Sequence, residues 1–524
     1  MTSEEGRFYV TAAIDYVNAA PHLGTAYEKI GCDVLTRYHS LCGQETRFVM
    51  GSDEHSQSVA RAAEAAGLTP QEFCSQQKEL FQSTWNAFSI QPTHYVQTDS
   101  AENRASTSAI MQRIYDAGHI YKGAYKAWYC PSCEQFYTDK QITDNQCPVH
   151  ERPLEWIEEE NYFFRLSAFQ EELKTLFEQH PDFLVPETRR NEILNVIEGG
   201  LEDISISRAF TSWGIPLPFD ATQVVYVWFD ALLSYLTGIG FPHEEREFAR
   251  FWPADVHVIG KDITRFHAVM WPAMLLAAGL PLPRKIHAHG FITLGGQKMS
   301  KTRGIFLDPM QLVKSYGSDA VRWVLMAEIP FDRDGDFSIE VFVDRYNADL
   351  ANDYGNLISR TEKMCLKYFG GEVPAPGTSD PLDDELEELV RKTLPRYESC
   401  FATLDLAGAL QSAMTIVRRA NKYIEESAPW SLAAAGDVRL RTVIRNLLET
   451  IRVATVLLAP FIPHGTTQVA GDFGLTIDAN AMSSLKGPWL TLKEGTTIGV
   501  GAILYPRLNR EEVLSREPSQ SHAH

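Results

Sequence analysis

The sequence predicts an α/β protein: a doubly wound parallel sheet of the Rossmann type with a zinc-binding insertion, followed by an α-helical bundle. Three observations predict this architecture. Strand-like apolar runs alternate with helical patterns through residues 8–291, which is typical of βα units. A segment with three cysteines and one histidine interrupts the alternation at 121–155. From residue 339 onward helical periodicity dominates, which indicates a separate bundle.

The first strand, loop and helix are suited to bind a phosphate. Residues 8–14 are β-branched and aromatic enough for a buried parallel strand, and residues 15–20 read as a loop. Pro21 starts a helical pattern, so His22 and Thr25 lie one turn apart at the helix N-terminus. Unpaired N–H groups and the positive end of the helix dipole favour a phosphate there. The alternative interpretation is a loop histidine that merely caps its helix.

The second predicted strand, residues 46–50, leads to a carboxylate at Asp53. Side chains just past the carboxyl end of a parallel strand lie over the crevice where doubly wound sheets bind ligands. Asp53 is therefore a candidate site residue. Its alternative role is the N-cap of a helix predicted over 57–67.

Three further strands are predicted in the second half of the sheet, at 224–230, 256–260 and 285–291. The middle one ends in Gly260 and is followed by Asp262. Glycine lets an adenosine approach the backbone closely, and an aspartate at that place accepts hydrogen bonds from ribose hydroxyls. These two residues are the candidates for nucleoside binding.

The interrupting segment carries paired metal ligands. Cys130-Pro-Ser-Cys133 is followed by Cys147-Pro-Val-His150, which is the spacing of a zinc knuckle. Three thiolates and one imidazole complete a tetrahedral Zn²⁺ site with no open position, so the predicted metal is structural. Unrelated surface cysteines are the alternative, but a short polar segment has little core of its own and metal binding would order it.

Composition narrows the possible classes. The net charge of −20 argues against a protein that coats nucleic acid, DNA included, through its phosphates. No run of about 18 apolar residues occurs and the N-terminus is acidic, so neither membrane insertion nor secretion is expected. Five of the eight cysteines are scattered, as expected for reduced thiols in the cytoplasm. Any RNA partner must be held locally.

The helical region carries residues suited to RNA. Helices are predicted at 382–400, 404–427 and 438–459, after one long helix that ends near Gly370. An amide, a guanidinium and an indole, the groups needed to bind unstacked bases, come from Asn356, Arg360 and Trp430. Arg418, Arg419 and Lys422 are expected to add local positive charge. By composition alone the region would be a structural helical domain.

A lysine-bearing loop completes the pattern that begins at His22. Lys298-Met-Ser-Lys301-Thr302 places two ammonium groups where they can close on a polyphosphate. With His22-Leu-Gly-Thr25 before it, this segment resembles the second of the two signature motifs of class I aminoacyl-tRNA synthetases. That family usually has a second histidine at the place of Thr25 and a serine at the place of Thr302. Because Thr25 lacks an imidazole, the expected ATP contact shifts to His22 and the lysines.

Within that class the chain resembles the methionyl-tRNA synthetase family over nearly its whole length. The resemblance is carried by segments 16–18, 51–55, 226–228, 260–262, 266–267, 356–360 and 428–430. Residue by residue it implies a methionine pocket made of Ile14, Tyr16, Asp53, Arg208, Trp228, Ala231, Leu232, Tyr235, Phe266 and His267. Asp53 would hold the substrate ammonium, with Arg208 orienting it, and aromatic walls suit a thioether. By residue type alone, Trp228 and Tyr235 would be core side chains.

The same resemblance implies the other roles. The expected ATP-binding residues are His22, Gly24, Gly260, Asp262 and Lys301. The expected catalytic residues are His22, Thr25, Lys298 and Lys301. The residues expected to read the CAU anticodon are Asn356, Arg360 and Trp430. The zinc site, Cys130, Cys133, Cys147 and His150, resembles that of family members with a single knuckle.

The implied reaction joins methionine to tRNA in two steps. The methionine carboxylate attacks the α-phosphorus of ATP, which binds with Mg²⁺, and the 2′-hydroxyl of the terminal tRNA adenosine then attacks the adenylate. The expected partners are ATP, L-methionine and tRNA(Met), both initiator and elongator, with no membrane and no DNA. A cytoplasmic monomer is expected.

The resemblance also implies a division of the chain. The expected divisions are 1–115 and 226–295 for the halves of the catalytic domain, 116–225 for the connective insertion, 296–338 for the lysine loop and stem-contact region, 339–510 for the helical anticodon-binding domain and 511–524 for a flexible tail. Two rival interpretations stay open. One is a class I synthetase for another amino acid, such as cysteine or valine, and the other is a catalytically idle tRNA-binding paralogue.

Overall fold

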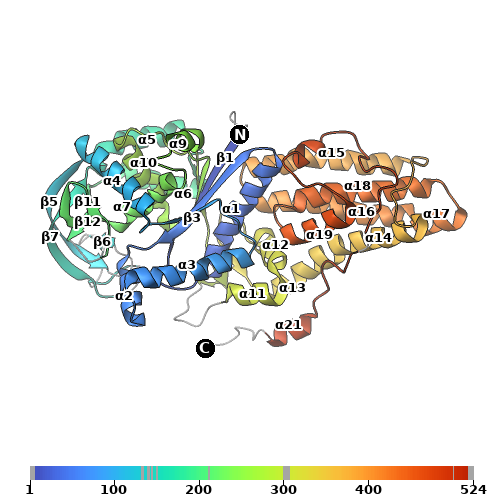
Figure 1. The fold of residues 1–524 in the computed structure, drawn as a ribbon, viewed down its shortest axis with the longest axis horizontal. Helices are drawn as coiled ribbons and strands as arrows, with labels where there is room; N and C mark the ends of the chain where they lie inside the picture. Colours follow the sequence, from blue (N-terminus) through green and yellow to red (C-terminus); the bar gives the residue numbers. More distant parts are fainter. Residues whose placement is uncertain are drawn as a thin grey trace.

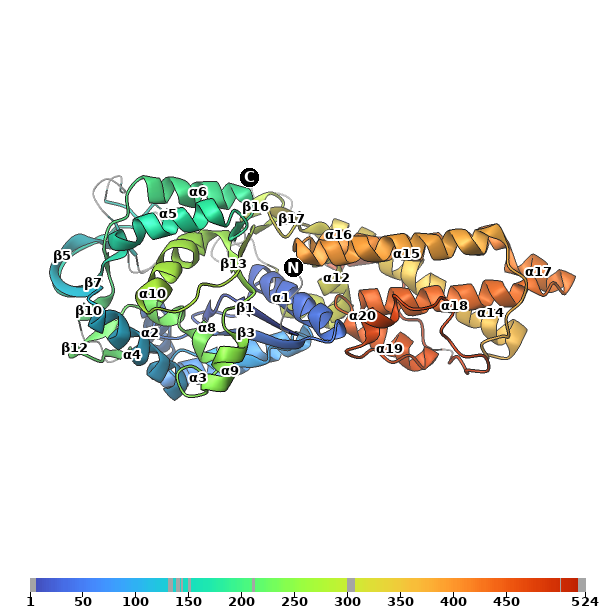
Figure 2. The same cartoon turned by 90° about the horizontal axis from the view of Figure 1, so that it is seen from above.

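The computed structural model describes residues 6–130, 135–137, 142, 145–148, 152–209, 213–298, 307–499 and 501–516. These residues form an elongated molecule with a sheet-centred body at one end and a helical bundle at the other (Figure 1). Seen from above, the long helices of the bundle run away from the sheet (Figure 2). In the part of the chain that is described, no helix is long and apolar enough to cross a membrane.

One seven-stranded parallel sheet organises the body. Its strands are β1 Arg7–Ala12, β2 Asp15–Tyr16, β3 Glu45–Asp53, β4 His94–Gln97, β8 Leu184–Val185, β13 Val256–Gly260 and β14 Ile286–His289. The strand order is β2-β3-β1-β13-β14-β8, with β4 also paired to β3. Every pairing is parallel. Because the chain goes from β1 to β3 on one side and β13 lies on the other, the strand order reverses between β1 and β13. The predicted doubly wound sheet is confirmed.

The two faces of the sheet enter different apolar cores. Phe8 and Val10 of β1 pack on one side, and the alternate residue Tyr9 packs on the other. The first core includes α1 Leu23–Leu41, α3 Pro70–Ala87 and α12 Ser318–Glu328, and the second includes α4 Ala101–Asp116, α8 Ser234–Thr237 and α10 Trp271–Ala277. Both faces are covered, which explains the continuous apolar strands.

The predicted strand at 224–230 is wrong. Its first residues end β12 (Asp220–Val225), which pairs with β10 (Ser207–Ala209) and β11 (Pro216–Leu217) in a small antiparallel sheet outside the main one. The chain then forms the short helix α7, Val227–Ala231. A short apolar run fits a buried helix as well as a strand, so the pattern alone could not separate them.

The region between the sheet halves is built around a long antiparallel pair of strands. The pair consists of β5 Ile120–Cys130 and β7 Glu155–Phe164, with β6 Gln135–Tyr137 and β9 Ile204–Ser205 at its edges. Helices α5 Gln170–Gln179 and α6 Glu187–Glu198 follow. Between them β8 pairs with β14 of the main sheet. Part of the predicted insertion 116–225 therefore completes the main sheet.

The C-terminal half is helical at the predicted places. Its first helix runs through α13 Ile339–Arg345, the π-helical segment η6 Tyr346–Gly355 and α14 Asn356–Phe369, and Gly370 ends it in the left-handed conformation. The remaining helices are α15 Pro381–Ala402, α16 Leu406–Ser427, α17 Pro429–Ala435, α18 Arg439–Leu458, α19 Pro463–Phe473, α20 Ala481–Ser484 and α21 Arg510–Arg516. Arg322 of α12 joins body and bundle, because its buried guanidinium donates to Phe88 O and Pro460 O and pairs with Asp33 at 2.7 Å.

Shorter elements complete the body. They are α2 Gln57–Ala66, α9 Glu245–Phe251, η4 Phe266–Met270, α11 Pro309–Tyr316, β15 Ile292–Leu294, β16 Gln297–Lys298 and β17 Gly335–Phe337. Strands β16, β15 and β17 form a small sheet, in which β15 and β16 lead into the lysine-bearing segment and β17 follows it in the chain. The segment η4 is π-helical, a geometry often found at functional sites.

Candidate functional site

The carboxyl ends of β1 and β13 define the candidate site. These neighbouring strands flank the point where the strand order reverses, which is where open α/β sheets bind ligands. After β1 the chain passes through β2 to the start of α1, and after β13 it passes to η4. The structure therefore brings the residues that follow β1, β3 and β13 to one edge of the sheet.

His22 caps α1 at this edge. The ring atom Nδ1 of His22 accepts a hydrogen bond from the backbone N–H of Thr25 at 3.2 Å. The backbone N–H of His22 donates to Thr25 Oγ1 at 3.0 Å. The Thr25 hydroxyl donates in turn to His22 O at 2.7 Å. Because Nδ1 accepts, the hydrogen of a neutral ring is on Nε2, where it can be donated to a phosphate oxygen. His22 is therefore the helix cap, held by three hydrogen bonds with Thr25, and its contact with a phosphate stays a prediction.

Gly260 and Asp262 lie together at the end of β13. A Cβ atom on Gly260 would come within 2.6 Å of Asp262 Oδ1. The Asp262 side chain is exposed, so its carboxylate is available at the surface of the crevice. The absence of a Cβ thus lets the Asp262 carboxylate lie against the strand end, as expected of a group that accepts from a ribose.

Three aromatic residues from different elements meet beside Asp53. The rings of Trp228 in α7 and Phe266 in η4 stack with centroids 3.9 Å apart and an angle of 5°. Tyr16 of β2 meets Trp228 edge to face at 6.1 Å. Tyr16 is paired in register with Asp53 of β3, and side chains at paired positions point to the same face. This cluster is the arrangement expected of the methionine pocket, and Trp228 is only partly buried.

The deeper part of the same region contains a neutral histidine hydrogen-bonded to a tyrosine. Tyr235 Oη lies 2.8 Å from His267 Nε2, and His267 Nδ1 lies 3.1 Å from Ile263 O. Burial lowers the pKa of His267 to about 4, against the weaker opposing effect of the Ile263 carbonyl. The ring is therefore neutral at pH 7, with Nδ1 donating to the carbonyl and Nε2 accepting from the tyrosine. A neutral ring at this place adds no charge beside an apolar side chain.

The predicted ammonium anchor, Asp53, is buried at 3% exposure at the end of β3. It is not the N-cap of the next helix, because Ser56 fills that position and accepts from Val59 N. Arg208 donates to Ser207 O at 2.6 Å and lies 4.4 Å above the Tyr226 ring. Contact between Asp53 and Arg208 stays a prediction.

The other predicted pocket residues differ in accessibility. Ala231 and Leu232 are buried at 3% and 1% exposure, so they form the back of the region rather than its surface. Ile14 is partly buried, and its Cγ2 would lie 3.2 Å from a Cβ on Gly51. Gly24 is partly buried in the first turn of α1, beside His22.

Two sets of predicted residues lie wholly or partly outside the described part of the chain. Lys301 is outside it, and Lys298 is described only through its backbone pairing with Thr293. Of the zinc ligands, Cys133 and His150 are outside, whereas Cys130 and Cys147 are buried at 0% and 1% exposure in one small cluster. Counting described residues only, no group of three or more potential metal ligands is present.

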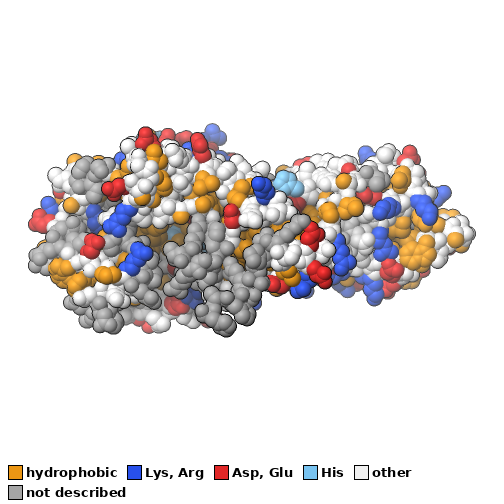
Figure 3. Space-filling model, turned by 90° about the horizontal axis from the view of Figure 1, so that it is seen from below, with side chains coloured by type: hydrophobic (Ala, Val, Ile, Leu, Met, Phe, Trp, Pro, Cys, Tyr) orange, Lys and Arg blue, Asp and Glu red, His pale blue; other side chains and the backbone are white. Residues whose placement is uncertain are grey.

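The predicted anticodon residues are on the bundle surface. Asn356 and Trp430 are exposed, the latter at 46%, and Arg360 pairs with Glu425 at 2.6 Å across α14 and α16. In Figure 3 apolar side chains gather at the far end of the bundle, with Lys and Arg side chains along it.

The expected positive charge of the neighbouring bundle residues is largely paired within the protein. Arg418 bonds Asp349 at 2.7 Å and Asp353 at 3.0 Å. Arg419 and Lys422 both pair with Glu426, at 2.9 and 3.1 Å. These three side chains therefore add less free positive charge than their number predicts.

Sequence reasoning missed a buried ionic cluster under the site. Lys29 of α1 is 1% exposed, and its Nζ donates to Ala13 O, Asp15 and Glu28 at 2.9, 2.8 and 3.0 Å. Glu28 also lies 3.0 Å from His289 of β14. A lysine in an amphipathic helix normally reads as solvent-facing, so only the long-range partners reveal this cluster.

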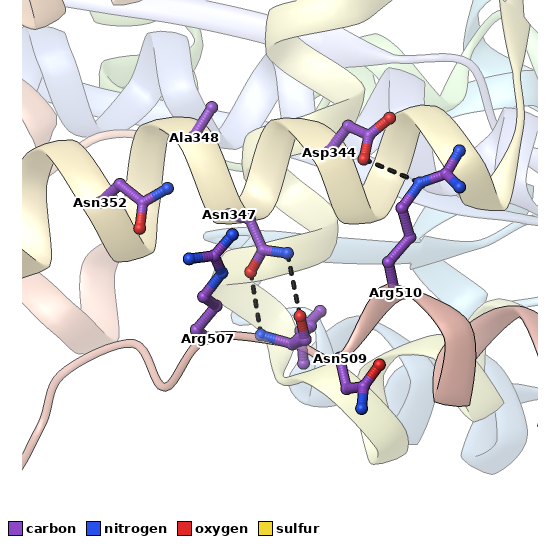
Figure 4. Close-up of a pocket in the computed structure, with 8 residues that line it drawn as sticks. Asp344, Asn347, Ala348, Asn352, Arg507, Asn509 and Arg510 are labelled. Carbon is purple, nitrogen blue, oxygen red and sulfur yellow. Dashed lines mark hydrogen bonds and ion pairs between the residues drawn. The ribbon is translucent and has the colours of Figure 1, made fainter.

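A cavity of about 570 Å³ lies away from the strand ends, between α13–η6 and the C-terminal segment (Figure 4). Asn347 forms two hydrogen bonds with the backbone of Leu508, and Arg510 pairs with Asp344 at 3.1 Å. The lining is polar and contains none of the predicted site residues. It therefore does not compete with the strand-end crevice as the reaction site.

The fold and this crevice define a class I aminoacyl-tRNA synthetase, and comparisons with known proteins specify the amino acid. The profile described as tRNA synthetases class I (M) matches residues 8–153 and 144–362. The profile described as anticodon binding domain of methionyl tRNA ligase matches 373–518. The chain belongs to the methionine–tRNA ligase family.

Relatives and solved structures agree with this assignment. The methionine–tRNA ligase of Caldanaerobacter subterraneus subsp. tengcongensis is 43% identical over 511 residues, covering 97% of this chain and 80% of that protein. That of Thermosynechococcus vestitus is 44% identical over 481 residues, covering 90% and 91%. The Mycobacterium tuberculosis methionyl-tRNA synthetase with methionyl-adenylate superposes with a TM-score of 0.92 at 39% identity, covering 96% and 100%. Its apo form gives 0.86 at 36% identity, covering 97% and 99%.

Proposed function

We infer that the chain is a methionine–tRNA ligase, which attaches L-methionine to its tRNA at the expense of ATP through a methionyl-adenylate. Family membership over nearly the full length supports this function. One structural observation carries it: Tyr16, Trp228 and Phe266 form an aromatic cluster at the carboxyl edge of the sheet, where Tyr16 is paired in register with the buried Asp53. Sulfur contacts aromatic rings favourably, and a carboxylate pairs with the substrate ammonium.

The first step requires the methionine carboxylate to reach the α-phosphorus of ATP. Asp53 holds the ammonium, and the aromatic cluster holds the thioether, so the carboxylate faces the nucleotide side of the crevice. There His22 donates from Nε2 to phosphate oxygens at the N-terminus of α1, and Lys298 and Lys301 close over the leaving pyrophosphate. Gly260 and Asp262 hold the ribose, and Mg²⁺ accompanies the triphosphate. No covalent enzyme intermediate is needed.

The second step transfers the methionyl group to tRNA. The terminal 2′-hydroxyl attacks the adenylate carbonyl, AMP leaves, and the ester of methionyl-tRNA forms. Asn356, Arg360 and Trp430 read the CAU anticodon at the bundle surface, which suits both initiator and elongator tRNA(Met). The exposed amide and indole, with the partly exposed guanidinium of Arg360 that pairs with Glu425, support this role, because unstacked bases need hydrogen bonds and a stacking surface.

A structural Zn²⁺ site belongs to the same proposal. Cys130 and Cys147 are buried together in a segment with a small apolar core, and Cys147 Sγ lies 3.6 Å from Tyr137 Oη. Bound zinc would be held by these thiolates with Cys133 and His150, and it would supply the ordering that this core lacks. We expect about one zinc per chain by elemental analysis, lost in Cys130→Ser. A fully active, metal-free preparation would rule the site out.

The decisive test of the function is ATP–pyrophosphate exchange with each of the twenty amino acids. Methionine is expected to stimulate exchange by at least about 100-fold over the other nineteen, because the aromatic walls select its side chain, whereas the ammonium that Asp53 holds is common to all amino acids. Stimulation by cysteine or valine instead would establish a different class I synthetase. No exchange with any amino acid, together with tRNA binding, would establish an idle paralogue.

The domain divisions, the oligomeric state and the location do not follow from the reaction. The divisions at residues 115, 225, 295, 338 and 510 stay predictions, as do a monomeric state, the cytoplasmic location and the absence of DNA and membrane partners. Limited proteolysis with mass spectrometry measures the divisions, and light scattering of the purified chain measures the mass. A mass of about twice 59.0 kDa would contradict the monomer.

A further inference from the structure

His55 joins three elements around the proposed methionine pocket. It follows β3 two residues after Asp53, and its side chain is 2% exposed. Nδ1 lies 2.6 Å from Asp230 Oδ2 of α7, and Nε2 lies 3.0 Å from Asp99 Oδ1 in the turn between β4 and α4. Carboxylates only accept hydrogen bonds, so each of these contacts needs a hydrogen on the ring nitrogen. With both carboxylates ionised, these two contacts require a doubly protonated imidazole.

The contacts of His55 with Asp230 and Asp99 are here called the His55 clamp. Asp230, its partner on α7, is itself held by α4. Asp230 is 1% exposed, and its Oδ1 accepts from Asn103 Nδ2 at 2.7 Å and from Thr107 Oγ1 at 3.0 Å, both in α4. Asp230 follows Trp228 by two residues in the same short helix. Because α7 has only five residues, the contacts that hold Asp230 also decide where the Trp228 ring lies.

Charged groups face His55 from each neighbouring element. They are Asp230 from α7, Asp99 from the β4–α4 turn, Arg104 of α4 through its ion pair with Asp99, and Glu54 beside it in the chain. Trp213 covers the ring edge to face at 5.2 Å. Burial alone would lower the pKa of His55, but the hydrogen bonds and charges of Asp230 and Asp99 raise it to about 9. The ring therefore keeps its proton at neutral pH.

We propose that His55 is a positioning residue for methionine binding. Clamped between Asp230 and Asp99, the imidazolium holds the end of β3, which carries Asp53, against α7, which carries Trp228. The ammonium anchor and the thioether wall come from these two elements, so the clamp sets the distance between them. This inference rests on the proposed function, because the pocket that His55 positions is the proposed methionine pocket.

The first variant to test is His55→Gln. Glutamine is neutral and donates from one end only, so one of the two carboxylates faces an acceptor and α7 shifts relative to β3. In methionine-dependent ATP–pyrophosphate exchange, we expect the KM for methionine to rise about tenfold. The kcat and the KM for ATP stay within twofold, because His22, Gly260 and Asp262 belong to other elements. His39→Gln is the matched control, since that partly buried histidine stacks on Phe8 away from the carboxyl ends of the strands.

The pH profile separates this role from mere structural support. The folded-state pKa of His55 lies above its ordinary value, so the clamp is intact at neutral pH and is lost as pH rises through about 9. The methionine ammonium also loses its proton in alkaline solution, so the informative quantity is the difference between wild-type and His55→Gln profiles. We expect the wild-type KM for methionine to rise more steeply above pH 8 than that of the variant.

Asp99→Asn provides an independent test if His55→Gln unfolds. Removing one carboxylate lowers the pKa of His55, so the inflection in the KM profile and the titration of the His55 ring resonance both move to lower pH. Superimposable profiles in all three proteins, or an ATP KM that rises as much as the methionine KM, would overturn the proposal. A wild-type chain without methionine-dependent exchange would instead contradict the proposed function.

Discussion

The sheet-centred body and the helical bundle place their polar groups in opposite ways. In the body, His55, Asp230, His267 and Lys29 are all less than a tenth exposed and are bonded to partners far away in the chain. In the bundle, the candidate recognition residue Trp430 is nearly half exposed above an apolar core. A small substrate must be held by desolvated, prearranged groups, whereas a folded RNA is met at an open surface. The two regions should therefore fail separately.

The largest effect is expected from Asp53→Asn. The isosteric amide removes the charge that pairs with the substrate ammonium in a buried site, which costs about 3 kcal/mol, or about 100-fold in kcat/KM for methionine. Binding of tRNA to the bundle stays within twofold. Methionine-dependent exchange and filter binding of tRNA measure the two effects. Equal losses in both assays would mean that body and bundle are not independent.

A smaller effect is expected from Trp430→Ala, which should impair tRNA charging and spare the exchange reaction. Stacking of one base on an aromatic ring contributes about 1–3 kcal/mol, so aminoacylation at limiting tRNA falls about 30-fold while exchange is unchanged. Trp156→Ala is the matched control, because Trp156 of β7 is equally exposed, at 51%, but lies on the connective strands. If the control lost as much charging activity, the bundle tip would not be the recognition surface.

Gly260→Ala separates the nucleotide side from the methionine side within the body. The new methyl group would lie 2.6 Å from Asp262 Oδ1, so the carboxylate must move away from the strand end. Losing its hydrogen bond to a ribose costs about 1.5 kcal/mol, or about tenfold in the KM for ATP. The KM for methionine stays constant. Gly471→Ala in α19, with nothing within 4 Å of its Cβ, is the control.

Thr25→Val gives the smallest expected effect. Valine keeps the shape but removes both hydrogen bonds that the hydroxyl forms with the His22 backbone. A lost helix cap costs about 1 kcal/mol, so we expect the KM for ATP to rise about fivefold. Thr25→Ser retains the hydroxyl and should stay within twofold of the wild type. If serine and valine behaved alike, the hydroxyl would not hold His22.

Patterns along the sequence were sufficient where structure is local. The first strand and helix follow from apolar periodicity and Pro21, and His22 lies at the predicted helix start. The bundle helices match the predicted ranges within a few residues, because each carries its own apolar face and ends at turn residues.

The strand predicted at 224–230 is wrong because local pattern alone was too short to decide its type. A short apolar stretch lacks the length that separates strand from helix, so its packing against α4 decided the outcome. Strand β8 escaped prediction because two residues form no pattern, and only pairing with β14 makes them a strand.

By itself the sequence determined the alternating architecture, the helical bundle and the type of residue at each strand end. Only the tertiary structure decided that Trp228, Phe266 and Tyr16 meet, and that His55 bridges two carboxylates. His55 and Asp230 are 175 residues apart, and no local periodicity encodes such a pair. Buried charges are tolerated only when distant partners compensate their desolvation, so those partners become known when the chain is folded.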